Sequence, residues 1–351
     1  MKKAVVAVLV LMLATTALSS CNSTPTIAKI GLGHLTSIAK SADLKVNEDG
    51  TKTGPFAQVD TVIAAVGFDK DGKVLKVAID TSQSKIVFDE NLVLTTDVSA
   101  AGKTKTELGD AYGMGKVSTI KKEWYQQAAE LEKWMAGKTV DQIKAMKTKQ
   151  RDASHTNVPD VPELTSLVTI TVQDYIAAVE EASKNAVAVA KGAVTLGVGH
   201  VVDLSASKGY ANVDGKETLP MGQVNFTISA VAFDKDGKVV QAVIDTAQTK
   251  VNYDKDGKVT SDKTAAPKTK KELGDAYGMA KASGIKKEWF QQIAELEKWM
   301  VGKTSAQITG MKTKTSGTHE GVPDVAELTS LVTVGVADYV AATAEAASKA
   351  K

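Results

Sequence analysis

The sequence has few of the residues that cross-link or catalyse. Cys21 is the only cysteine among 351 residues, which excludes a disulfide within one copy of the chain. Aromatic residues make up 5% of the chain, and there are only four histidines. No Ser-His-Asp arrangement, paired-carboxylate site or phosphate-binding loop occurs at a recognisable spacing. The sequence therefore gives no support for hydrolytic catalysis, and we expect the protein not to be an enzyme.

Long hydrophobic runs are confined to the N-terminus. Lys2-Lys3 precedes an almost wholly apolar run over residues 4–18. This layout is typical of a secretory signal, and the run is shorter than the ~20 residues that a transmembrane helix needs. The segment Leu18-Ser19-Ser20-Cys21 resembles the bacterial lipobox, in which a peptidase cleaves immediately before a lipidated cysteine.

This resemblance implies that residues 1–20 are a lipoprotein signal peptide and that Cys21 carries diacylglycerol. A free cysteine at a plain signal cleavage site is the alternative. Each buried CH₂ of the lipid adds roughly 0.8 kcal/mol to membrane affinity, so several acyl chains make a durable anchor. We expect an extracytoplasmic protein that is lipid-anchored to the cell membrane or envelope surface, with residues 21–27 as a short tether.

The sequence also lacks an excess of one charge. Its formal net charge is +2. Loss of Lys2 and Lys3 with the signal peptide brings the charge to about 0, so the mature surface has no basic excess. We therefore expect no nucleic acid among the partners of the protein.

Long segments of the chain occur twice in the same order. Phe68–Val74 returns as Phe233–Val239, 165 positions later, and the octapeptide Glu107–Met114 is identical to Glu272–Met279. This period is too long for a solenoid and indicates a duplicated domain. We expect repeat domain 1 over 28–185, repeat domain 2 over 194–351, and a stiff, partly helical linker over 186–193. Each domain would have its own core, the first beside the membrane and the second facing outward.

The sequence of each copy predicts an α+β domain with a mainly antiparallel sheet packed with helices. Val59–Val66 and Val74–Ile79 flank Asp71-Gly72 as a β-hairpin. Ile120–Met135 has helical periodicity, with Trp124 facing the core and Glu132 facing water. A helix is predicted over Val140–Met146, capped by Thr139, and a strand over Leu167–Thr171. Another helix is predicted to begin at Val172, with Thr171 and Asp174 as its capping box. Core positions are expected for Trp134, Trp289 and Trp299.

The four histidines match between the copies, His34 with His200 and His155 with His319. Two histidines of one copy could form a metal or redox-centre site. No cysteine or local carboxylate pattern completes such a ligand set, so we favour a packing or hydrogen-bonding role and predict no metal. Asp69-Lys70-Asp71-Gly72 resembles the start of a calcium loop, but strand-like residues follow it, which favours a hairpin turn.

The repeated octapeptide has glycines on both sides of a tyrosine, Tyr112 in the first copy and Tyr277 in the second. A tyrosine beside flexible backbone can stack on a planar ligand. The alternative is a sheet-to-helix connection whose glycines adopt unusual φ angles and whose Tyr and Met fill the core. Polar strand ends at Asp80-Thr81 with Gln83, repeated as Asp245-Thr246 with Gln248, could bond the same ligand or form a solvated strand face.

The order of hairpin, central helix, strand and final Ala-rich helix resembles the FMN-binding domains of bacterial electron-transfer lipoproteins and sodium-pump subunits. In that family a Ser-Gly-Ala-Thr-x-Thr-Ser segment carries a threonine that is joined to FMN. The matching segments here are Ser166–Val172 and Ser330–Val336, so the resemblance implies Thr169 and Thr333 as acceptors. Leu-Val replaces Gly-Ala in both copies, and a backbone that approaches a phosphate accommodates glycine better than leucine.

The leading hypothesis from the sequence is a membrane-anchored surface lipoprotein with two FMN-binding-like domains. It implies FMN as cofactor, electron transfer outside the cytoplasm and a redox partner protein. The alternative is a ligand-binding or structural cell-surface lipoprotein without redox chemistry. The expected cofactor-binding residues are Thr169, Thr333, Tyr112, Tyr277, Gln83 and Gln248.

Overall fold

The computed structural model describes residues 26–190 and 192–351. The chain is an α+β protein of two similar halves, each with an antiparallel sheet packed against helices, as the sequence predicts. Cys21 and the expected signal peptide lie outside the described residues.

The first half is built around the sheet β5-β4-β1-β8. Its strands are β1 (Lys29–Ser37), β2 (Lys45–Val46), β3 (Lys52–Thr53), β4 (Phe56–Phe68), β5 (Val74–Val87), β6 (Thr148–Lys149), β7 (Val158–Pro159) and β8 (Val187–Ala188). Its helices are α1 (Lys105–Leu108), the 3₁₀ helix η1 (Gly109–Tyr112), α2 (Met114–Val117), α3 (Trp124–Met135), α4 (Val140–Lys144) and α5 (Gln173–Lys184).

The second half repeats this order around the sheet β13-β12-β9. Its strands are β9 (Thr195–Asp203), β10 (Ala211–Val213), β11 (Lys216–Thr218), β12 (Met221–Phe233), β13 (Val239–Asn252), β14 (Thr313–Ser316) and β15 (His319–Pro323). Its helices are α6 (Lys270–Leu273), η2 (Gly274–Tyr277), η3 (Met279–Lys281), α7 (Trp289–Met300), α8 (Ser305–Thr309) and α9 (Ala337–Ser348).

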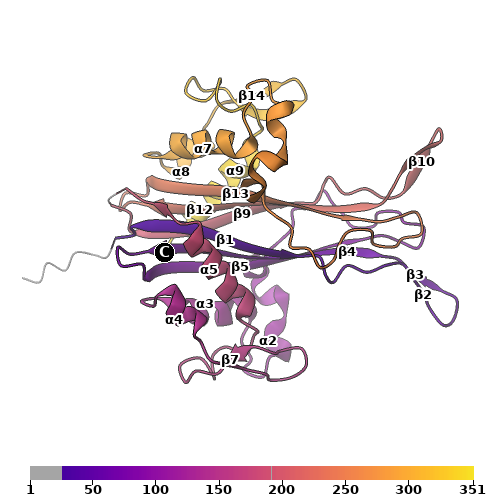
Figure 1. The fold of residues 1–351 in the computed structure, drawn as a ribbon, viewed down its shortest axis with the longest axis horizontal. Coiled ribbons are helices and arrows are strands. Elements are labelled where there is room, and N and C mark those ends of the chain that lie inside the picture. Colours follow the sequence, from indigo (N-terminus) through magenta and orange to yellow (C-terminus); the bar gives the residue numbers. More distant parts are fainter. Residues whose placement is uncertain (1–25, 191) are drawn as a thin grey trace, which may run out of the picture.

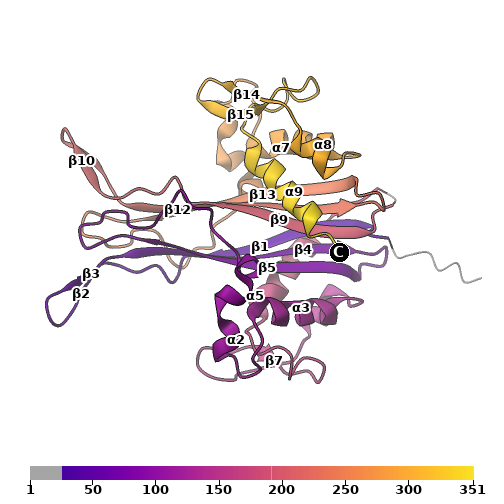
Figure 2. The ribbon, with the colours of Figure 1, turned by 180° about the vertical axis from the view of Figure 1, so that it is seen from behind.

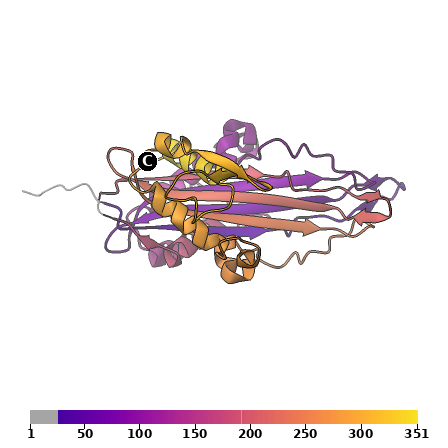
Figure 3. The same ribbon diagram turned by 90° about the horizontal axis from the view of Figure 1, so that it is seen from above.

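The two main sheets lie face to face in the middle of the molecule, and the helices of each half cover the outer face of its own sheet (Figure 1). Seen from above, the long strands of both sheets run along the long axis (Figure 3). One apolar cluster joins Ile30 and Ile63 of the first half to Phe226 and Ile228 of the second. Each half also has a helix-covered core of its own, and this shared cluster lies between the two sheets in addition to them. One face of each sheet is apolar, and the other sheet buries it.

Main-chain hydrogen bonds also connect the halves. Leu44 N donates to Gly257 O at 2.9 Å, Tyr210 N donates to Leu92 O at 2.9 Å, and Gly102 N donates to Val202 O at 3.1 Å. The rings of Phe88 and Tyr253 meet edge to face at 5.4 Å. The hairpins β2–β3 and β10–β11 project from the same end of the molecule (Figure 2). The repeats therefore form one body with a shared interior.

The segment between the repeats differs from its prediction as a partly helical linker over 186–193. Helix α5 ends at Lys184, and Val187 and Ala188 form strand β8 against Ile30 and Lys29 of β1. The β-branched Val187 suits an extended backbone, and the unpaired edge of β1 offers it hydrogen-bond partners. Sheet pairing therefore replaces the expected helix.

The predicted hairpin and central helix are present. In the hairpin turn, Asp69 Oδ1 accepts hydrogen bonds from Asp71 N and Lys73 N, and Gly72 has φ 77°. Helix α3 buries Trp124, Ala128, Leu131 and Met135, as expected. It begins at Trp124 rather than Ile120, because Lys121 has a positive φ and Glu123 forms the N-terminal capping box.

Two other local predictions are wrong. Residues Leu167–Thr171 form an irregular segment after a turn rather than a strand, and Val172, without a side-chain cap, precedes α5 in place of the Thr171 capping box. Val168 and Ile170 are buried in the core beneath α3 and α5, so their β-branched side chains reflect burial rather than sheet pairing. Glu132, expected to face water, accepts a hydrogen bond from Ile79 N at 2.7 Å, and its side chain is 11% exposed.

Candidate functional site

His34 lies on β1, on the face that packs against the opposite sheet. The neighbouring Gly31 and Gly33 face helix α5. A Cβ at Gly33 would lie 1.9 Å from Ala178 O, and a Cβ at Gly31 would lie 1.8 Å from Ala182 O. The repeated Gly-x-Gly-His sequence therefore brings α5 directly onto the strand and leaves His34 on the other face.

Glu181 on α5 holds His34 at the open edge of β1. Its Oε2 accepts a hydrogen bond from His34 N at 3.0 Å, and its Oε1 lies 3.2 Å from His34 Nδ1. β8 covers only Lys29 and Ile30 on this edge, so the amide of His34 has no strand partner there. The carboxylate replaces that missing partner and fixes the ring at the same time.

The other nitrogen of the ring faces the second half of the chain. Glu272 of α6 approaches His34 Nε2 to 3.5 Å through its Oε2. The cluster of His34, Glu181 and Glu272 therefore spans the repeat interface, and one donor atom from each residue lies within 4.8 Å of the others. We name these three residues the first cluster.

The second cluster is the counterpart of the first and consists of His200, Glu345 and Glu107. His200 N donates to Glu345 Oε2 at 2.6 Å, and His200 Nε2 lies 3.0 Å from Glu107 Oε2. Its Nδ1 is buried, 3.6 Å from Glu345 Oε2, and has no hydrogen-bond partner among residues 26–190 and 192–351. The domain duplication therefore produces two imidazole–dicarboxylate groups, each assembled from both halves.

Charge within the clusters shifts the pKa values of their members. Burial lowers the pKa of His34, but the carboxylates of Glu181 and Glu272 raise it by more, so the net pKa lies above its usual value. The hydrogen bond from His200 is the main cause that lowers the pKa of Glu107 to about 2. The shift of Glu107 favours an ion pair across the interface between the halves, whereas that of His34 arises first from Glu181 of the same half.

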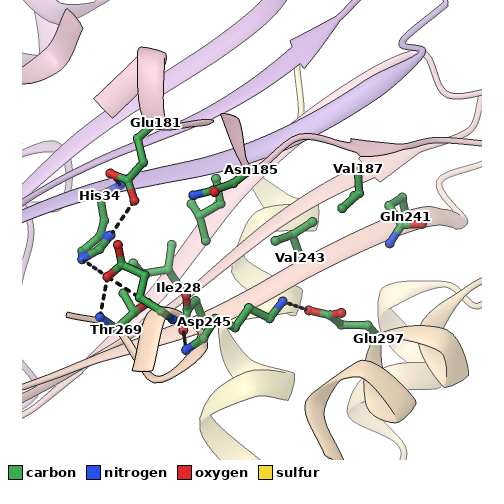
Figure 4. A pocket seen from close by; sticks show the side chains of 13 residues that line it. His34, Glu181, Asn185, Val187, Ile228, Gln241, Val243, Asp245, Thr269 and Glu297 are labelled. Carbon is green, nitrogen blue, oxygen red and sulfur yellow. Dashed lines mark hydrogen bonds and ion pairs between the residues drawn. The ribbon is translucent and has the colours of Figure 1, made fainter. Parts of the chain in front are cut away.

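A cavity of about 290 Å³ opens beside the first cluster (Figure 4). Small-molecule sites usually have volumes of about 300 Å³ or more, so this cavity suits a small ligand. Four carboxyl side chains and one lysine line it, together with His34: Glu181, Asp245, Glu272, Glu297 and Lys271. Burial raises the pKa values of Asp245 and Glu297. The cavity is therefore rich in carboxyl groups whose ionised form costs free energy to bury.

The corresponding cavity of the other half has a different charge. Asp80, Glu132, Lys349 and Lys351 are its charged lining residues, so acids and bases are equal in number there. Lys349 pairs with Glu345 of the second cluster, and Lys351 pairs with Glu132. The positions that match these lysines in the first half hold Asn185 and Val187. Two lysine ammonium groups are thus present at the second cavity and absent at the first.

The structure separates the histidines that the sequence paired within each copy. His155 Nδ1 lies 2.7 Å from Asp152 Oδ1 in an exposed turn, and His319 is exposed on β15. His34 instead meets glutamates from α5 and α6. A metal site made of His34 and His155 is therefore excluded by their placement.

The repeated octapeptide forms the sheet-to-helix connection that the sequence offered as an alternative. Thr104 and Glu107 make a capping box, and Gly109 and Gly113 have φ values of 51° and 79°. Tyr112 packs against the core of the first half and donates to Gln83 Oε1 at 3.1 Å. Two of the expected ligand-contacting residues therefore lie together.

In the second half, Tyr277 packs against the core, and the Lys270 ammonium lies 5.2 Å from its ring centre. Gln248 lies on β13, opposite Asn225 of β12. The polar strand end is solvated only in part, since Gln83 is exposed, whereas Asp80 is 3% exposed and its Oδ2 accepts from Thr104 Oγ1 at 2.8 Å. Asp80 therefore anchors the start of α1, and its pairing with Thr104 requires no ligand.

Thr169 and Thr333 are tied to buried amides. Gln127 Oε1 accepts from Thr169 N at 2.8 Å and lies 3.2 Å from Thr169 Oγ1, and Gln292 holds Thr333 in the same way. Val168 and Val332, which replace the family's small residue before the threonine, are buried in the helix-covered cores. This packed, internally bonded turn does not fit a phosphate joined to either threonine.

The sequence contained part of the signal for the clusters. His34 and His200 repeat, and Glu107 and Glu272 lie in the identical octapeptide. The sequence did not show which residues lie close together in the folded chain. Glu181 is 147 positions from His34, and Glu272 comes from the other repeat.

Comparison with models of protein families, with curated proteins and with solved structures finds no match to this chain. Among the residues that the structure describes, no helix is long and apolar enough to cross a membrane.

Proposed function

We propose that this chain is a non-catalytic, lipid-anchored binding protein outside the cytoplasm that takes a small cationic ligand at the interface of its two repeats. The observation that carries the proposal is the cavity beside the first cluster. Its lining has four carboxyl side chains against one lysine. Such an excess of acids favours a cation, because attraction between opposite charges is strong where water is scarce.

The cost of burying these acids supports the same ligand class. Lys271 Nζ donates to Glu297 Oε1 at 2.6 Å and compensates one carboxylate of the cavity. His34 lies between Glu181 and Glu272, but within the described part of the chain Asp245 receives only main-chain and hydroxyl hydrogen bonds. A bound cation would supply the charge that the lining lacks. Its binding free energy would then stabilise the folded chain by mass action.

The test is a thermal-unfolding screen of the purified mature protein in detergent. We expect small cations, such as divalent metal ions and short polyamines, to raise Tm, whereas neutral solutes of similar size leave it unchanged. The Glu272→Gln variant should lose most of this increase because it removes a carboxylate from the cavity. The same Tm with and without every cation tested would contradict the proposal.

The membrane anchor is tested separately at Cys21. The lipobox-like segment supports lipidation, which predicts a native mass larger than that of the 21–351 polypeptide by a diacylglyceryl group, with or without a further acyl chain. The Cys21→Ala variant should lose this mass and leave the membrane fraction. An unmodified cysteine in the native protein would overturn the anchor while leaving the cation site untouched.

A second candidate function is non-covalent flavin binding with electron transfer to a redox partner outside the cytoplasm, which the family resemblance implies. The observation that favours it is the contact between Tyr112 and Gln83 beside the Gly-rich connection. Native protein should then show absorbance near 450 nm and release FMN on denaturation. Colourless protein that takes up no added FMN would remove this candidate.

A further inference from the structure

We propose that the first cluster binds one divalent transition-metal ion of the zinc class and that Lys349 closes the second cluster to metal. This inference rests on the proposed cation site and names its ligand. It assigns different roles to two clusters that consist of the same three residue types. The inference depends on the residue that directly follows the last helix of each repeat, Asn185 after α5 and Lys349 after α9.

The first cluster offers the donor atoms that such ions prefer. It combines the imidazole of His34 with two carboxylates, and imidazole favours zinc and its neighbours over calcium or magnesium. Bonds of about 2.1 Å at tetrahedral angles place two ligand atoms about 3.4 Å apart. His34 Nε2 and Glu272 Oε2 are 3.5 Å apart. These two atoms therefore already have the separation of neighbouring ligands.

Glu181 completes the site from the other side of the ring. It lies 3.2 Å from His34 Nδ1 and also holds the His34 main-chain N–H. A carboxylate on one imidazole nitrogen fixes the ring and strengthens the other nitrogen as a metal ligand. Glu181 on Nδ1 and a metal ion on Nε2 of His34 would form such a carboxylate–histidine–metal arrangement. The remaining coordination positions would face the cavity.

Lys349 distinguishes the second cluster. Its ammonium pairs with Glu345, the counterpart of Glu181, and is a permanent cation beside the carboxylate. His200 Nε2, the counterpart of the ligand nitrogen, is 3.0 Å from Glu107 and within hydrogen-bond distance. In the first half the matching residue is Asn185, whose amide carries no charge and whose side chain is exposed. Among the described residues, a lysine therefore pairs with a cluster glutamate only at the second cluster, whereas Lys271 beside the first cluster pairs with Glu297.

The experiment uses reciprocal exchange of these two residues in the full mature protein. Calorimetric titration of metal-free wild type with Zn²⁺ should give one tight site per chain. The Asn185→Lys variant should lose this site, and Lys349→Asn should gain a second one. Glu181→Gln should weaken the site by about 10- to 100-fold, the usual effect of losing a partner that orients a ligand.

Controls separate loss of metal from loss of fold. Asn185 is exposed, so Asn185→Lys should unfold like wild type in metal-free buffer. The Glu107→Gln variant alters the second cluster and should keep the wild-type site. His155→Ala with His319→Ala should also keep it, which removes the two exposed histidines as the source. Co²⁺ in place of Zn²⁺ should give a visible d–d spectrum that the Glu272→Gln variant lacks.

Three results would overturn the metal inference. They are two equal sites in wild type, unchanged Zn²⁺ affinity in Asn185→Lys or Glu272→Gln, and stabilisation by polyamines without any by metal ions. The last result would leave the proposed cation-binding function standing. Failure of every cation to stabilise the protein would instead remove that function together with the inference.

Discussion

Single residues hold the two halves together by placing charge and hydrogen bonds where water is scarce. Glu107 binds His200, and Glu272 approaches His34, each across the repeat interface. Gln127 makes its contacts within one half, and its side chain is fully buried. We name this residue with its hydrogen-bond partners the glutamine hub. Gln127 Nε2 donates to Lys122 O and Gln127 Oε1 accepts from Thr169 N, and Gln292 repeats these contacts in the second half. Polar groups of this kind are costly to leave without partners.

The glutamine hub gives a prediction for stability. Gln127→Leu should lower the free energy of unfolding by about 1–3 kcal/mol, because the amide of Thr169 would stay buried without its acceptor. Urea denaturation measures the change, and Gln173→Leu at the exposed start of α5 is the control. Equal stability of the two variants would show that the hub contributes nothing measurable.

The ion pair of Glu107 with His200 predicts a loss of stability in acid. The pKa of Glu107 is about 2 in the folded chain and 4.5 ordinarily. A lowered pKa stabilises the fold above the ordinary value, and this contribution is lost as pH falls from about 4.5 to about 2. Melting curves across this range should therefore drop less steeply for Glu107→Gln than for wild type or for the exposed Glu163→Gln. Parallel pH profiles would contradict this assignment.

At the same scale, the sequence identified single side chains better than their partners. It predicted core positions for Trp124 and Trp289, which are 1% exposed, while Trp134 and Trp299 are only partly buried. It gave His34 a packing or hydrogen-bonding role without naming a partner, and it expected Glu132 to face water. Both side chains bond groups far away in the sequence, and local periodicity carries no information about such partners.

Among the elements, close contact between α5 and β1 determines where the first cluster forms. The helix approaches the strand over Gly31 and Gly33 and presents Glu181 to the edge of the sheet. The sequence predicted the hairpin and the central helix because their periodicity is strong. It missed β8 and the irregular segment at 167–171, because pairing with a free edge and burial between helices depend on the assembled fold.

This contact gives a prediction for Gly33→Ala. The new Cβ would lie 1.9 Å from Ala178 O, so the helix must move away from the strand. We expect a loss of about 3 kcal/mol, the upper end of the usual cost of overpacking, together with weaker cation binding. Gly284→Ala is the matched control, because a Cβ there meets nothing within 4 Å. Denaturation and cation titration of both variants measure the effects, and wild-type behaviour of Gly33→Ala would contradict the close approach.

At the scale of the whole molecule, the duplication forms a single folded unit. Composition and repeats predicted two copies and the α+β class, but they did not show that the apolar faces of the two sheets pack against each other. Alternation along Val59–Val66 indicates a strand with one buried face and does not say what covers that face. The opposite repeat covers it here, as the shared cluster shows.

The shared interior predicts cooperative unfolding. Calorimetry of the mature protein should show one transition whose calorimetric and van't Hoff enthalpies agree, because neither sheet can expose its inner face alone. A fragment of residues 194–351 should be unfolded or should aggregate, since it would expose that face to water. Two separate transitions, or a soluble folded fragment, would show that the halves are independent.

The meeting of the two repeat starts has a consequence for how the protein is displayed. Ile27 N donates to Ala193 O at 2.9 Å, so both repeats begin at the same end of the molecule. The hairpins β2–β3 and β10–β11 lie at the opposite end (Figure 1). With a lipid on Cys21, both repeats would lie side by side at the bilayer surface. The hairpin tips would be the first part of the protein that an approaching molecule or surface meets.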